Sequence, residues 1–294
     1  MRFDAGRGMK TEFAGDTHVG MRRDHNEDAL LILPEENLFV VADGMGGHSS
    51  GEVASKLAVD TIKEFFQNTS VDQDVTWPFQ TDPGSDYQVN RLVTAVKLAN
   101  QRISEASSAS GSMKGMGTTV VAACLSENRL LVAHVGDSRC YRFRKGRIEL
   151  LTEDHSLLND FRRTLHLTEE EERNFPHKNI IVRALGMKWS VDVDVAVHEP
   201  QPGDLYLLCT DGLSGELDDS AMTKVLKHEV SVLKATQRLV QMANRNGGRD
   251  NVTAILLRVH EDDYPGYQDL TEELSREISD DFSDTTQVDV PTRD

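Results

Sequence analysis

Residues 28–43 read DALLILPEENLFVVAD, and this stretch decides how the chain begins to fold. Two apolar runs, ALLIL and LFVVA, flank the turn-forming PEEN, a pattern that predicts a β-hairpin. If the turn centres on its two glutamates, the strands pair so that Asp28 lies opposite Asp43. Two carboxylates about 4 Å apart repel by about 4 kcal/mol at an effective dielectric of 20, which destabilises a sheet. We therefore expect a cation between the two aspartates.

Other acidic residues stand at the ends of apolar runs in the same way. Asp137 follows LLVAHV, Asp211 follows LYLLC and Asp250 precedes VTAILL, each with one residue between. An Asp-Gly pair after a strand is usually only a turn, so the prediction depends on the repetition. Together with Glu27 and the hairpin pair, these residues could gather at one rim of a sheet. Hard oxygen ligands of this kind suit Mg²⁺ or Mn²⁺.

The periodicity of the remaining chain predicts many strands and two pairs of helices. Helical spacing is found at about 53–66, 89–103, 220–228 and 230–245, and strand-like runs at 118–125, 129–135, 140–143, 147–151, 191–197, 204–209 and 252–259. Residues 154–186 are mixed and highly charged, and we expect a short helical excursion on the surface. This order fits an α+β layered domain better than alternating βαβ units. We expect one domain over residues 1–260.

Charge and composition narrow the function classes. The chain has 294 residues and a formal net charge of −17, which argues against a general affinity for nucleic acid or anionic membranes. No apolar run approaches the roughly 18 residues of a membrane helix, and the N-terminus lacks the apolar core of a secretory signal. Cys124, Cys140 and Cys209 are widely spaced within apolar runs, which predicts buried free thiols and a cytoplasmic location.

The negative charge is concentrated at the C-terminus. Residues 261–294 hold 12 acidic and 2 basic residues, which is typical of a solvated, flexible tail. Apolar residues spaced by four within it leave open a short docking helix: they are Leu270, Leu274, Ile278 and Phe282. The tail lacks the Asp-x-Asp-x-Asp-Gly spacing of an EF-hand, so a calcium site there is a poor alternative.

Six short motifs in order carry a resemblance to a known family. They are RRDHNED within residues 22–28, VADGMGGH at 41–48, GMGTT at 115–119, HVGDSR at 134–139, CTDGL at 209–213 and GRDNVT at 248–253. Over about Thr11–His260 the chain resembles the metal-dependent serine/threonine protein phosphatases of the PPM, or type 2C, family in a bacterial-type form. The resemblance implies a four-layer α-β-β-α sandwich, with two central antiparallel β-sheets flanked by helical pairs. Residues 154–186 correspond to the family's variable flap beside an acidic cleft.

The resemblance also implies a centre with two ions, Mn²⁺ or Mg²⁺. By motif match, Asp43 bridges the two ions, and the carbonyl oxygen of Gly44 serves the second. Asp211 and Asp250 hold the first ion. A water molecule activated by the metals would attack the phosphorus atom.

Further residues receive weaker roles from the same match. Glu27 and Asp28 lie against the second ion, directly or through water, and Asp137 with Asp211 matches a weaker third site. Arg23 matches the phosphate-binding arginine, because a planar guanidinium can grip two phosphate oxygens. Arg23 and Asp43 are therefore the expected catalytic residues.

The sequence departs from the family at the position of the general acid. Eukaryotic members carry a histidine directly after the Asp-Gly pair, whereas Met45 occupies it here. His48 follows further along, and we interpret it as a cap or packing residue. A metal-bound water could serve as the acid instead, and His155, at the start of the expected flap, is also a candidate.

The expected activity is hydrolysis of phosphoserine and phosphothreonine on proteins. Phosphorylated proteins are the expected partners, a cognate serine/threonine kinase among them, and the chain is expected to act as a monomer. The alternative is a catalytically weak phosphoprotein-binding regulator of the same fold, although the intact Asp43, Asp211 and Asp250 speak against it. A two-metal nuclease is a further alternative, but an acidic body offers no basic groove for a nucleic-acid backbone.

Overall fold

The hairpin of residues 28–43 forms with the predicted register. In the computed structural model, strands β2 (Asp28–Leu33) and β3 (Leu38–Met45) pair antiparallel, and Asp28 lies opposite Asp43. The connection is the short 3-10 helix η1 (Pro34–Glu36), which Asn37 closes in the left-handed region at φ 46°. The structure describes residues 9–46, 50–71, 77–80, 82–109, 111–126, 128–164, 171, 175 and 180–261.

The η1 turn is fixed by contacts from both sheets and from a helix. The Asn37 carbonyl oxygen accepts a hydrogen bond from the Leu125 N–H at 3.0 Å. Thr11 Oγ1 donates to Asn37 Oδ1 at 3.2 Å. The buried Arg91 guanidinium lies 2.8 Å from Glu36 Oε2. The turn is therefore held from several directions at the end of the hairpin opposite the two aspartates.

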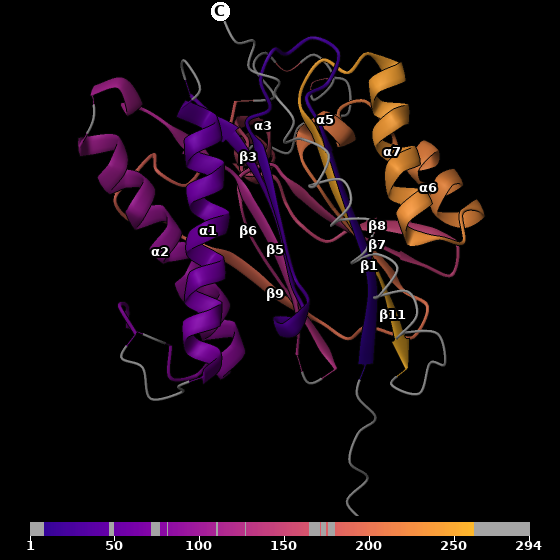
Figure 1. The fold of residues 1–294 in the computed structure, drawn as a ribbon, viewed down its shortest axis with the longest axis horizontal. Helices are drawn as coiled ribbons and strands as arrows, with labels where there is room; N and C mark the ends of the chain where they lie inside the picture. The colour runs from indigo at the N-terminus through magenta and orange to yellow at the C-terminus, as the bar shows by residue number, and fades with distance from the viewer. Residues whose placement is uncertain are drawn as a thin grey trace, which may run out of the picture.

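Two antiparallel sheets are built around this hairpin (Figure 1). The first has the order β2-β3-β5-β6-β9, with β5 (Val120–Ser126), β6 (Arg129–Val135) and β9 (Asp194–His198), and the two-residue β4 (Gly117–Thr118) pairs with the end of β3. The second has the order β1-β11-β10-β7-β8, with β1 (Met9–His18), β11 (Val252–Glu261), β10 (Leu205–Cys209), β7 (Arg139–Arg144) and β8 (Arg147–Leu150).

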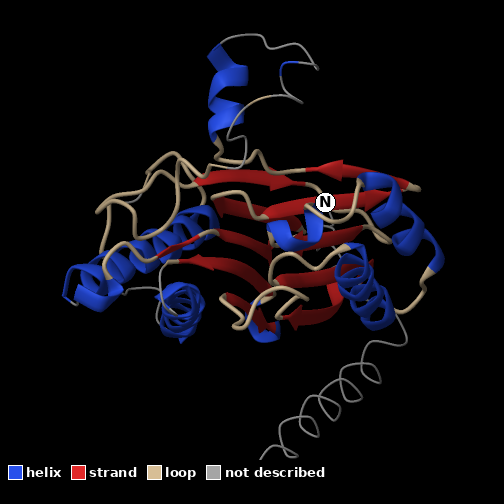
Figure 2. Cartoon of the chain, turned by 90° about the horizontal axis from the view of Figure 1, so that it is seen from above, coloured by secondary structure: helices blue, strands red, loops and turns tan. Residues whose placement is uncertain are grey.

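Helical pairs cover the outer faces of the sheets, and Figure 2 shows the strands enclosed between helices. The first sheet is covered by α1 (Ser50–Val71) and α2 (Tyr87–Ala109), and the second by α6 (Asp219–His228) and α7 (Val232–Asn246). Shorter helices are η2 (Gly111–Met113), α3 (Leu157–Thr164) and α5 (Asp211–Ser214). The predicted α-β-β-α sandwich is confirmed.

Strand β3 shows how one sequence contributes to two of the three core layers. Leu38 and Val40 face the layer beneath α1 and α2, whereas Phe39 and Val41 face the layer between the two sheets. All four side chains are fully buried. A strand that is buried on both faces requires a continuous apolar run, which is what LFVVA provides.

Some expectations from the sequence differ from the structure or lie outside the described residues. The periodicity predicts no strand over residues 9–18, yet β1 forms there and pairs with β11 over its whole length. The apolar stripe of residues 270–282, the rest of the tail beyond Glu261, and His48 lie outside the described residues, as does part of the expected flap. In the described part of the flap, α3 is the expected helical excursion. Within the described chain, no helix is both long and apolar enough to cross a membrane.

Candidate active site

The predicted acidic residues converge at one end of the sandwich, because the charge of each shifts the pKa of others. They belong to elements such as β3 and α5, whose labels lie near this end in Figure 1. Asp43 is in the last part of β3, and Asp211 is the first residue of α5, directly after β10. The carboxyl groups of these two residues lie close enough for each to shift the pKa of the other. Asp250 comes two residues before β11, and Asp137 is in the turn between β6 and β7. The two sheets thus contribute to one cluster, because strands from both end at the same rim.

Asp28 is anchored by two threonines. Its Oδ2 atom accepts hydrogen bonds from Thr253 Oγ1 at 2.7 Å and Thr210 Oγ1 at 3.0 Å. Its Oδ1 atom is buried and has no hydrogen-bond partner among the described residues. Burial raises the pKa of Asp28 to about 7 against the opposing effect of the two hydroxyls, and the charges of Asp211 and Asp250 raise it further. An oriented carboxylate with one buried free oxygen is a metal-ligand geometry.

The pKa values of the other carboxyl groups in the cluster are also raised by burial and by neighbouring negative charges. Burial, followed by the charges of Asp28 and Asp211, raises the pKa of Asp43 well above its usual range. Burial and the Asp250 charge raise the pKa of Asp211. Burial raises the pKa of Asp137 to about 7, and its Oδ1 is a second buried oxygen without a described partner. Like charges removed from water need compensation, so the cluster fits divalent cations.

Close backbone packing explains the glycine in the Asp43-Gly44 pair. A Cβ atom on Gly44 would lie 2.1 Å from the carbonyl oxygen of Gly51 in α1 and 2.5 Å from that of Glu27. The Gly44 N–H donates to the Glu27 carbonyl oxygen at 3.1 Å, and Ser55 Oγ donates to the same oxygen at 2.6 Å. Burial raises the pKa of the Glu27 carboxyl, which also accepts a hydrogen bond from the Gly51 N–H. Helix α1 therefore holds Glu27 beside the cluster.

Arg23 lies at the rim of the cluster. Its Nη2 is 2.7 Å from Asp250 Oδ2, and its side chain is half exposed. The loop that carries it is held by Asn251, whose Nδ2 donates to the carbonyl oxygens of Val19 and His25. Asn251 Oδ1 also accepts a hydrogen bond from the Glu27 N–H, just after the loop, at 2.8 Å. Arg23 thus combines a fixed backbone with a guanidinium that faces solvent.

Thr210, Thr253 and Asn251 had no assigned role in the sequence prediction. All three lie inside the recognised motifs, next to or near an aspartate of the cluster. The sequence signal was therefore present, but hydroxyl and amide groups beside strand ends are too common to indicate a contact. The cluster brings together Glu27, Asp28, Asp43, Asp137, Asp211 and Asp250, with Arg23 at its rim. Their roles as ligands remain predictions.

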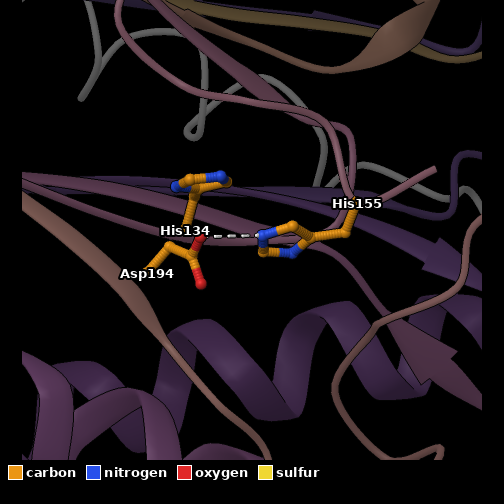
Figure 3. A group of neighbouring side chains, drawn as sticks. All are labelled: His134, His155 and Asp194. Carbon is orange, nitrogen blue, oxygen red and sulfur yellow. Dashed lines mark ion pairs between the residues drawn. The ribbon is translucent and has the colours of Figure 1, made fainter. Parts of the chain in front are cut away.

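A second group of titratable side chains consists of His134, His155 and Asp194 (Figure 3) and contacts the turn that carries Asp137. The rings of His134 and His155 stack with their centroids 4.7 Å apart, and His155 Nε2 lies 3.3 Å from Asp194 Oδ2. The Gly136 N–H donates to His155 Nδ1 at 3.0 Å, so the neutral ring carries its proton on Nε2, facing Asp194. A protonated Nε2 does not ligate a metal ion.

The same contacts argue against His155, one of the candidates for the general acid. The ring is 3% exposed and both of its nitrogens face protein groups. Burial, together with the neighbouring His134, lowers the pKa of His155 to about 4. Its backbone N–H also donates to the Gly136 carbonyl oxygen at 2.9 Å. His155 is therefore a buried residue that positions the turn before Asp137.

Comparison with known proteins agrees with this architecture. The family description "Protein phosphatase 2C" matches residues 14–256. The serine/threonine phosphatase stp of Listeria monocytogenes is 34% identical over 256 residues, which is 85% of this chain and 95% of that protein. The crystal structure of the serine/threonine phosphatase Stp1 from Staphylococcus aureus has a TM-score of 0.75 at 32% identity, covering 88% of this chain and 98% of that one.

A third relative was solved with metal. It is the catalytic domain of the serine/threonine protein phosphatase PstP in complex with two manganese ions, with a TM-score of 0.72 at 32% identity. The match covers 86% of this chain and 100% of that one. The family match spans most of the described sandwich, including every strand that contributes to the acidic cluster. This chain belongs to the protein phosphatase 2C family.

Proposed function

We propose that this chain hydrolyses phosphoserine and phosphothreonine on proteins, with two Mn²⁺ or Mg²⁺ ions bound at the acidic rim. The observation that carries the proposal is the cluster of buried carboxyl groups with raised pKa values and two partnerless oxygens, on Asp28 and Asp137, among the described residues. Such a cluster is unstable without cations, and the relative PstP was crystallised with two manganese ions. The family membership supplies the reaction class.

The residues divide the work of holding the ions. We assign Asp43, the Gly44 carbonyl oxygen, Asp211 and Asp250 to the two ions. Bound divalent ions would supply a nucleophile from water at neutral pH and offset the negative charge of the phosphate. Asp43 is suited to binding both ions because several neighbouring carboxylates raise its pKa, which places it at the centre of the cluster.

Other residues support this centre. Glu27 and Asp28 are assigned to the second ion, directly or through water, and Asp137 with Asp211 to a weaker third ion. Arg23 is assigned to the phosphate. Its guanidinium now pairs with Asp250 through one nitrogen and is half exposed, so it can turn toward a phosphate oxygen at the rim.

The setting of the enzyme follows from the same assignment. Phosphorylated proteins are its substrate class, and a cognate serine/threonine kinase would be one such protein. We propose a monomeric, cytoplasmic enzyme. The location is supported by three cysteines that are free and buried, as expected of a protein that folds in a reducing compartment.

One experiment tests the proposal against the alternative of a phosphoprotein-binding regulator. The full chain is assayed with p-nitrophenyl phosphate and with a phosphothreonine peptide, in Mn²⁺ or in EDTA. Turnover that requires the metal and is lost in Asp211→Asn supports the phosphatase. Binding of the phosphopeptide without turnover in Mn²⁺ would support the regulator instead, and turnover that persists in EDTA would contradict the proposed centre.

A further inference from the structure

A surface hollow of about 710 Å³ lies between the C-terminal part of α2 and the loop after Leu185. One side is formed by serines of α2, among them Ser104 and Ser108. The other sides are two loops, 111–115 and 186–189. None of the residues assigned to the metal ions lines this hollow, so it is separate from the acidic cluster.

Polar side chains of α2 hold both loops in place. Asn100 is 1% exposed, and its Nδ2 donates to the carbonyl oxygens of Lys188 at 3.1 Å and Trp189 at 2.9 Å. Asn100 Oδ1 accepts from the Gly186 N–H at 2.9 Å. On the opposite side, Ser107 Oγ accepts a hydrogen bond from the Gly115 N–H at 3.1 Å and donates one to the Met113 carbonyl oxygen. Because these bonds fix the backbone, the hollow is a built feature of the fold.

The side chains presented by these loops are unusual for a surface. Trp189 is 63% exposed and Met187 is 54% exposed, although large apolar residues are normally buried. Lys114 and Lys188 also line the hollow, and neither pairs with a carboxylate in the described part of the chain. Among the described residues that line it, none is acidic, although the whole chain carries a net charge of −17. The hollow thus combines two exposed apolar side chains with a local positive charge.

Backbone pairing connects the hollow to the acidic rim. Leu185 and Thr118 exchange two backbone hydrogen bonds, of 2.9 and 3.1 Å. Thr118 in turn pairs with Gly44, which follows Asp43. Gly115 in the hollow is three residues from Thr118, so the two residues are at most about 10 Å apart. A peptide whose phosphorylated residue lies at the rim would therefore reach the hollow with about three or four further residues.

We propose that this hollow binds the segment of a phosphoprotein substrate that flanks the phosphorylated residue. It takes an apolar side chain against Trp189 and Met187 and acidic side chains beside Lys114 and Lys188. The occupant follows from position and charge, because a substrate held at the rim extends past this surface and acidic flanks complement the two lysines. This inference rests on the proposed phosphatase function and adds a preference among its substrates.

The test compares two kinds of substrate on the full chain in Mn²⁺. Three phosphothreonine peptides carry a Leu-Asp-Asp segment three residues before the phosphothreonine, the same segment three residues after it, or serines in both places. p-Nitrophenyl phosphate has no flanking segment and reports the reaction centre alone. The variants are Trp189→Ala and the double variant Lys114→Ala/Lys188→Ala. Val230→Ala is the control, because Val230 is an exposed apolar residue that does not line the hollow.

We expect one flanked peptide to have a KM about tenfold lower than the serine peptide. Trp189→Ala and the lysine double variant should each remove most of this advantage, measured relative to their own turnover of p-nitrophenyl phosphate. Val230→Ala should keep it. Trp189→Phe should retain it in part, because an apolar ring remains. Wild-type protein without p-nitrophenyl phosphate turnover would refute the phosphatase proposal itself, which separates the two failures.

Two results would overturn the inference while the phosphatase stands. The first is equal KM values for all three peptides, or an advantage that Trp189→Ala leaves intact. The second assigns the hollow to another occupant. A synthetic peptide of residues 262–294 that inhibits wild type but not Trp189→Ala would assign it to the chain's own tail, and a dimer that Trp189→Ala dissociates in sedimentation would assign it to a second copy.

Discussion

Replacement of Asp28 by asparagine removes one charge from a group of buried carboxylates, and we expect it to stabilise the metal-free protein. The pKa of Asp28 is raised from 3.8 to about 7 in the folded chain, chiefly by burial. A difference of about three pKa units corresponds to about 4 kcal/mol between the two protonation states. At pH 7.5 the folded protein without metal carries this cost. The side-chain amide of the variant carries no charge, and its oxygen would still accept the hydroxyls of Thr210 and Thr253.

The pH dependence follows from the direction of the shift. A carboxyl group with a raised pKa in the folded state binds its proton more tightly there than in the unfolded chain. Its contribution to stability is fully present below pH 3.8 and is lost as the pH rises through about 7. The advantage of Asp28→Asn over wild type in EDTA should therefore be small near pH 4 and grow towards pH 7.5. A divalent cation should reverse the order, because it compensates the ionised carboxylate.

The measurement is thermal unfolding of both proteins at pH 4.5, 6 and 7.5, in EDTA or in Mn²⁺. In EDTA at pH 7.5 the variant should unfold at most about 10 °C higher, and it should gain less than wild type from Mn²⁺. Asp204→Asn is the control, since Asp204 is a buried aspartate that pairs with Arg144 at 2.6 Å, and its loss should destabilise with or without metal. An Asp28→Asn protein that is less stable than wild type in EDTA at pH 7.5 would refute the reasoning.

Three further substitutions test the site. Arg23→Ala should lower kcat/KM for p-nitrophenyl phosphate and for phosphopeptides about 10- to 100-fold, with partial recovery in Arg23→Lys; equal loss in both variants would point to the fork geometry, and no loss would remove the phosphate role. Thr253→Val should weaken Mn²⁺ binding about tenfold in calorimetry, whereas Thr236→Val, which removes a buried hydroxyl bonded within α7, should leave it unchanged. His155→Gln should flatten the loss of stability in urea between pH 6.5 and 4, because the lowered pKa of the imidazole makes the folded state resist protonation there; an unchanged slope would contradict this.

The hairpin and its register were predictable because several local signals agree. The apolar runs, the turn composition and the closing asparagine all specify the same pairing, so Asp28 could be placed opposite Asp43 by counting. The helices flanking the sandwich were predictable from their spacing in the same way. In contrast, β1 has the sequence MKTEFAGDTH, which lacks clean alternation, and its ten pairings depend on β11 from the far end of the chain. Sequence periodicity contains no information about such a partner.

The acidic residues of the site were predictable from the sequence, but the residues that hydrogen-bond to them and hold the loops were not. Strand-end aspartates are recognisable in the sequence, whereas the bonds from Thr210 and Thr253 to Asp28 join positions more than 180 residues apart. The same holds for Asn100, which fixes a loop 86 or more residues later in the chain. The threonine contacts arise because strands from both sheets end at one rim, and the Asn100 contacts because the loop lies against α2, so both follow from the tertiary fold.

The η1 turn sets the register of the hairpin, although it lies at the opposite end of the two strands from the acidic cluster. The six paired positions of β2 and β3 place it about 20 Å from the paired aspartates. One extra residue there would shift every pair in the ladder by a step and turn one aspartate away from its mate. Natural variation in loop length, which other surface loops can absorb, should therefore be as restricted at Pro34–Asn37 as at the ligands themselves.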